Sequence, residues 1–135
     1  MKNILLIAFV AICMIACRKD DQNFKLKTIT INSYTKKEFP AQRLYVRVID
    51  AVDTQRLIGK SESYPSNLPL PVTLAVPSSQ KQTLYKNTCY VQLWGDSTGM
   101  ISSAKMNMDL YKISFPLSMN VSNKDMDITL SGSWE

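Results

Sequence analysis

Apolar and polar residues alternate with a period of two along most of the chain after residue 25, and this pattern limits the possible folds more than any other feature of the sequence. Successive side chains of a β-strand point to opposite faces, so such alternation is typical of strands with one buried and one solvated face. No segment keeps the 3.6-residue apolar period of a helix over ten residues. We therefore predict strands over residues 26–34, 44–51, 56–62, 70–76, 88–95, 100–108, 111–121 and 126–134.

Three of these strands have faces that can be assigned directly from the alternation. The side chains predicted to form the core are Leu44, Val46, Val48, Cys89, Val91, Leu93, Met126, Ile128 and Leu130. The opposite faces carry Arg43, Tyr45 and Arg47 on one strand, Tyr90, Gln92 and Trp94 on another, and Asp125, Asp127 and Thr129 on the third.

Turn-forming residues separate the predicted strands. Residues 53–55, 95–99 and 122–125 are rich in Asp, Asn, Ser, Thr and Gly, which favour hairpin turns. Pro69, Pro71 and Pro77 bracket residues 72–76, and proline cannot donate to a strand ladder, so this segment is predicted to be an edge strand. The whole pattern predicts an all-β fold, a single antiparallel β-sandwich of about seven to eight strands.

The first 16 residues have the pattern of a signal peptide. Lys2 gives a positive start, and residues 4–15 form an apolar run of twelve residues. As a helix this run would be roughly 18 Å long, against the ~30 Å hydrocarbon core of a membrane. We predict a lipoprotein signal peptide over residues 1–16, a lipid-anchored polar tether over 17–25 and the sandwich domain over 26–135.

The segment Met14-Ile15-Ala16-Cys17 resembles the lipobox of bacterial lipoproteins. The resemblance implies cleavage before Cys17 and attachment of a diacylglyceryl group and palmitate to that residue. Two or more acyl chains anchor a protein stably in a membrane. We therefore expect the protein to be attached to a membrane through the lipid on Cys17.

Lys19, Asp20 and Asp21 follow closely and resemble the surface-export signal of lipoproteins from the Bacteroidota. This resemblance implies an outer-membrane location facing the cell exterior. The alternative is that residues 18–23 form only a polar tether, in which case the domain could face the periplasm.

Composition limits the chemistry of the domain. The chain has no histidine, which removes the usual general base of serine and cysteine hydrolases and the commonest ligand of transition metals. We expect no enzymatic activity, no cofactor and no bound metal. The chain has 16 Lys and Arg residues against 11 Asp and Glu residues. The cations are scattered in runs of at most two, so a nucleic-acid partner is not expected.

Several single residues have an ordinary structural interpretation. Cys89 lies on an apolar strand face, where a thiol packs as a small hydrophobe. Asp50, Asp53 and Asp96 lie at strand ends or turns, where aspartate caps the backbone. Asp125 and Asp127 are the nearest approach to a calcium loop but lack its spacing. The five methionines after residue 99 are expected to fill the core.

The remaining candidate is a surface patch made of Arg43, Tyr45, Arg47, Tyr90 and Trp94. If the two strands are neighbours in one sheet, aromatic and guanidinium groups lie together and could anchor a protein or stack on sugar rings. The alternative is ordinary cross-strand packing.

A family resemblance can be stated for residues 44–51, 68–74 and 90–93 with the turn at Gly99. These segments resemble the small lipoprotein domain of the type III secretion pilotin family, some members of which escort or stabilise an outer-membrane secretion ring. The resemblance implies a lipid-anchored β-sandwich that docks to another envelope protein without catalysis. The alternative hypothesis is a carbohydrate-binding accessory lipoprotein at the cell surface.

Overall fold

The computed structural model describes residues 24–35, 39–79, 88–107 and 118–134. Within these residues every regular element is a strand, and none is a helix long and apolar enough to cross a membrane. The strands are β1 (Phe24–Tyr34), β2 (Arg43–Asp50), β3 (Leu57–Lys60), β4 (Tyr64–Pro65), β5 (Val72–Ala75), β6 (Thr88–Gly95), β7 (Gly99–Asn107), β8 (Ser118–Ser122) and β9 (Met126–Trp134).

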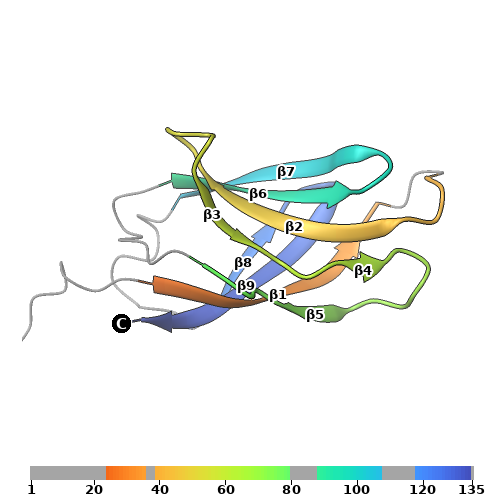
Figure 1. The fold of residues 1–135 in the computed structure, drawn as a ribbon, viewed down its shortest axis with the longest axis horizontal. Coiled ribbons are helices and arrows are strands. Elements are labelled where there is room, and N and C mark those ends of the chain that lie inside the picture. Colours follow the sequence, from red (N-terminus) through yellow and green to blue (C-terminus); the bar gives the residue numbers. More distant parts are fainter. Residues whose placement is uncertain (1–23, 36–38, 80–87, 108–117, 135) are drawn as a thin grey trace, which may run out of the picture.

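The strands form two antiparallel sheets that pack face to face as a β-sandwich (Figure 1). Sheet I has the strand order β5-β1-β9-β8. Sheet II has the order β3-β2-β6-β7, and the short strand β4 pairs with the start of β2. The predicted all-β sandwich is confirmed.

Hairpins join β2 to β3, β6 to β7 and β8 to β9 within a sheet, whereas the chain changes sheet after β1, β4, β5 and β7. The strands β1 and β9 lie side by side (Figure 1). Their register places Phe24 opposite Trp134. Both ends of the described chain therefore lie at the same end of the sandwich.

The core lies between the sheets, and the predicted strand faces are confirmed. All nine side chains assigned to the interior from the alternation are buried, and Val46, Val91, Leu93 and Ile128 have no exposed surface. Burying one such side chain contributes roughly 1.5–3 kcal/mol. The sandwich is therefore held mainly by the inner faces of β1, β2, β6 and β9.

The predicted turns are also present. Asn123 accepts hydrogen bonds from the backbone N–H groups of Asp125 and Met126 at 2.8 and 2.9 Å, which closes the β8–β9 hairpin. Gly99 ends the β6–β7 turn with a φ of 78°, a conformation that glycine adopts without steric cost. Strand β5 lies at the edge of sheet I, as its flanking prolines predicted.

Many strand ends lie one or two residues from their predicted positions, for example β3 over 57–60 against the predicted 56–62. Strand β1 begins at Phe24, two residues inside the predicted tether, because Phe24 is buried and pairs with β9. The two-residue strand β4 was not predicted, since a pair of residues is too short to show alternation. Of the strand predicted over residues 111–121, the structure describes only the part in β8, and residues 108–117 lie outside the described residues.

Candidate functional site

The predicted surface patch depends on β2 and β6 being neighbours, and the structure pairs them directly. Tyr45 lies opposite Trp94, and Arg47 lies opposite Gln92. Residues that are directly opposite in an antiparallel pair project to the same side of the sheet. Tyr45, Arg47 and Trp94 therefore share the outer face of sheet II.

The centre of this face is an aromatic pair. The rings of Tyr45 and Trp94 are stacked, with centroids 6.4 Å apart and planes at 13°. Both side chains are half-buried. The indole N–H of Trp94 donates to the amide oxygen of Gln92 at 3.0 Å, which satisfies its polar atom and fixes the ring.

Two cations lie over these rings. The guanidinium carbon of Arg47 is 5.3 Å from the centroid of Trp94, and the amine of Lys60 is 4.3 Å from the centroid of Tyr45. Both distances are within the range of cation–π attraction. We call Tyr45, Trp94, Arg47 and Lys60 the aromatic–cation cluster.

Lys60 was not among the predicted site residues. It lies on β3 directly opposite Arg47, on the far side of β2 from Trp94. The signal that could have found it is the hairpin register between β2 and β3, because the register determines which residue of β3 faces Arg47. That register includes an irregularity after Val48, which the residue pattern alone does not reveal.

The other two predicted patch residues lie at the periphery. Arg43 is exposed, and its guanidinium donates to the hydroxyl and the carbonyl oxygen of Ser63 at 2.8 and 3.2 Å. Tyr90 lies opposite Lys105 of β7 and is four residues from Trp94 along β6, a separation of about 13 Å. The predicted set of five therefore forms a compact centre with two outlying members.

The outer face of sheet II is basic. The cross-strand pairing places these residues on it: Arg43, Tyr45, Arg47, Ile49, Leu57, Lys60, Thr88, Tyr90, Gln92, Trp94, Met100, Ser103, Lys105 and Asn107. Four of them are cations and none is a carboxylate. The described carboxylates lie elsewhere. Asp50 ends β2 and pairs with the inward-facing Cys89, Asp127 lies in sheet I, and the others lie in turns or loops: Asp53, Glu62, Asp96 and Asp125.

The turn aspartates have the capping role that their positions predicted. Asp50 accepts hydrogen bonds from the backbone N–H groups of Val52 and Asp53 at 2.8 and 3.1 Å. Asp96 accepts one from the backbone N–H of Arg43 at 3.1 Å. These carboxylates hold the backbone of turns.

Asp127 of sheet I accepts hydrogen bonds from the side chains of Asn32 and Asn120 at 3.2 and 2.7 Å. Among the residues that the structure describes, no three Cys, Asp or Glu side chains are grouped closely enough to hold a metal ion. The neighbours of Asp127 are therefore amide donors of its own sheet.

Cys89 is buried in the core cluster, as predicted. Burial, followed by the nearby negative charge of Asp50, raises the pKa of its thiol to about 12. The thiolate is the reactive form of cysteine, so this thiol is inert at neutral pH.

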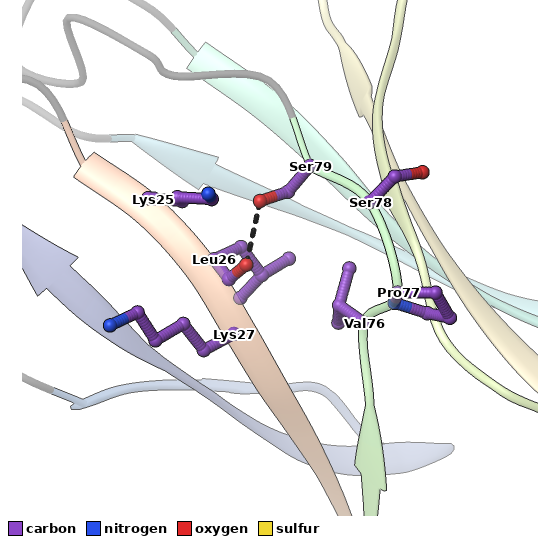
Figure 2. Close-up of a pocket in the computed structure, with 7 residues that line it drawn as sticks. All are labelled: Lys25, Leu26, Lys27, Val76, Pro77, Ser78 and Ser79. Atoms are coloured by element: carbon purple, nitrogen blue, oxygen red, sulfur yellow. Dashed lines mark hydrogen bonds between the residues drawn. The ribbon is translucent and has the colours of Figure 1, made fainter.

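A cavity of about 460 Å³ lies where β1 passes the segment after β5. It is lined by Lys25, Leu26, Lys27 and residues 76–79, and Figure 2 shows the amine of Lys27 directed away from it. The hydroxyl of Ser79 donates to the carbonyl oxygen of Leu26 at 2.7 Å across the cavity (Figure 2). The lining segment ends at Ser79, where the described residues are interrupted, and no ligand is assigned to this cavity.

Comparison of the chain with protein-family models, curated protein sequences and solved structures finds no match. The predicted lipidation residue Cys17 and the predicted export signal Lys19, Asp20 and Asp21 lie outside the described residues.

Proposed function

We propose that this protein is a lipid-anchored binding module of the cell envelope, without catalytic activity, that docks to another envelope protein through the outer face of sheet II. The observation that carries the proposal is the aromatic–cation cluster at the centre of that face. Trp, Tyr and Arg are the residues that most often dominate the binding energy of protein interfaces. Here all three lie together on the surface of a rigid sheet.

The geometry of the rings favours a protein partner over a sugar. A carbohydrate platform needs aromatic faces that are open to solvent and coplanar. In this cluster Tyr45 and Trp94 stack on each other, and a cation lies over each ring. A partner therefore meets half-buried ring edges and positive charge, which suits polar and apolar side chains of a protein.

The envelope location rests on the first part of the chain. The signal-peptide pattern and the lipobox at Cys17 favour a lipid anchor, and the residues that follow favour the outer membrane facing the cell exterior, with the periplasmic face as the alternative. Six residues, 18–23, separate Cys17 from the start of β1, so the two can be at most about 25 Å apart. Such a short tether would keep the sandwich close to the membrane surface.

The proposal can be tested by crosslinking and affinity purification of the lipidated protein from its native envelope. Trp94→Ala is expected to reduce a specifically captured partner at least tenfold, which corresponds to about 1.4 kcal/mol or more. Thr129→Ala, on the half-buried outer side of sheet I, is the matched control and should leave capture unchanged.

A melting curve must accompany this comparison. Loss of the aromatic pair and its cation contact should cost the fold only about 1–3 kcal/mol, so the variant should remain folded. Equal capture by wild type and Trp94→Ala would contradict docking at this face. Binding on a glycan array with no captured protein would favour the carbohydrate alternative.

A further inference from the structure

Resting on the proposed function, we infer that the partner presents an acidic peptide segment, and that Arg47 and Lys60 bind a carboxylate of that segment between them. The positive charge of the face, rather than its aromatic content, selects this class of partner.

The first observation is a cross-strand pair of like charges. Arg47 and Lys60 are directly opposite each other on neighbouring strands and project to the same side. Like charges in this position normally destabilise a sheet. An anion bound between them would turn this repulsion into two favourable contacts.

The second observation is the lack of a counter-charge within the protein. In the described ranges the one ion pair joins Arg56 to Asp50 at 3.9 Å, in the β2–β3 hairpin. Neither Arg47 nor Lys60 pairs with a described carboxylate, and their contacts are with aromatic rings. No described carboxylate therefore neutralises these two charges, and both can interact with a bound anion.

The third observation is that the cations are held in place. The ring of Trp94 is fixed by its hydrogen bond to Gln92 and by stacking on Tyr45, and these rings support Arg47 and Lys60. A cation already positioned for binding loses less conformational entropy when the ligand arrives. The two cations are thus already positioned to bind an anion.

The surroundings favour a peptide as the source of that anion. Arg43 lies four residues from Arg47 along β2, about 13 Å away, which matches acidic residues four positions apart on an extended segment. The exposed apolar side chains of Leu57 and Met100 lie on opposite sides of the face and offer contacts to apolar residues. An acidic polysaccharide could meet the same cations but has no apolar side chains to contact Leu57 and Met100.

The test uses the full lipidated protein in detergent and a fluorescent peptide of about eight glutamates, with the equivalent glutamine peptide as the neutral probe. We expect the glutamate peptide to bind and the glutamine peptide not to bind. The affinity for the glutamate peptide should fall as the salt concentration rises from about 0.05 M to about 0.5 M. Arg47→Gln with Lys60→Gln should weaken binding at least tenfold. The control, Lys27→Gln with Lys124→Gln, removes the same charge from exposed positions outside the face and should change binding less than twofold.

Two results would overturn the inference. Equal loss of binding in both double variants would show that only net charge matters. Stronger binding of polygalacturonate than of the glutamate peptide, lost in the Arg47 and Lys60 variant, would assign the face to an acidic glycan.

A second measurement separates this inference from the proposed function. A photocrosslinking residue at the exposed position Met100 should label the native partner, and the labelled peptide can be sequenced. An acidic labelled peptide would support the inference. A labelled peptide without acidic residues would overturn the inference while leaving protein docking at this face intact, and labelling of no protein would count against both.

Discussion

At the scale of single residues, Cys89 shows how position determines chemistry. The alternation of β6 predicted that its side chain points inward with Val91 and Leu93, and all three are buried. In that apolar setting the neutral thiol is favoured over the thiolate. Cys89 therefore serves as part of the core, as its place on the strand predicted.

This burial predicts a pH dependence of stability. The ordinary pKa of the thiol is 9.0, and in the folded protein it is about 12. Below pH 9 the thiol is protonated in both the folded and the unfolded protein, so it contributes its full share to the free energy of unfolding. As the pH rises from 9 towards 12, the unfolded chain releases the proton and the folded chain keeps it, so the free energy of unfolding should fall by about 1.4 kcal/mol per pH unit.

The measurement is urea unfolding at pH 8, 9, 10 and 11 for the wild type and for Cys89→Val, which cannot titrate at this position. Lysines and tyrosines titrate in the same range in both proteins, so the difference between the two isolates the thiol. A difference that does not change with pH would show that Cys89 is accessible to solvent in the folded state.

At the scale of secondary-structure elements, the β6–β7 hairpin is held by a residue from outside it. The amide oxygen of Gln42, just before β2, accepts hydrogen bonds from the backbone N–H groups of Ser97 and Thr98, both at 3.1 Å. Its amide nitrogen donates to the hydroxyl of Thr98 at 2.9 Å. Gln42 is only 9% exposed, and it occupies the space that a side chain at Gly95 would need.

This arrangement predicts that two substitutions are not additive. Gln42→Ala should cost about 1–3 kcal/mol because it removes several hydrogen bonds. Gly95→Ala should cost a similar amount because its Cβ would overlap the side chain of Gln42. With the Gln42 side chain absent that overlap disappears, so the double variant should be no less stable than Gln42→Ala alone.

Chemical denaturation of the two single variants and the double variant completes the cycle. Ser66→Ala is a useful control, since its hydroxyl accepts only the backbone N–H of Gln42. Simple addition of the two single costs would mean that Gly95 is required for a reason other than its contact with Gln42.

At the scale of the whole molecule, the proposed anchor makes the most direct prediction. Cys17→Ala should prevent lipid attachment and move the protein from the membrane fraction to the soluble fraction, because no acyl chains would then hold it. Cys13→Ala is the control, since Cys13 lies within the predicted signal peptide. The readouts are membrane fractionation and incorporation of labelled palmitate, and unchanged membrane retention of Cys17→Ala would refute the anchor.

The residue pattern was sufficient for the class of fold and for the faces of its strands. Inward positions such as Val46, Leu93 and Ile128 follow from the period of two, because a strand turns alternate side chains to opposite sides. The flanking prolines likewise indicated that β5 lies at an edge, because proline lacks the N–H that a second neighbouring strand would need. These properties are local, so a single sequence contains them.

The candidate site depended on information that is not local. The sequence placed Tyr45, Arg47 and Trp94 on outward faces, but only the pairing of β2 with β6 brought their side chains into contact. Lys60 belongs to the cluster because the irregular register of the β2–β3 hairpin places it opposite Arg47. The strand pairings also place Arg43 and Tyr90 at the periphery of the cluster. Strand order and register are decided by how the two sheets bury their apolar faces together, and that is a property of the folded chain as a whole.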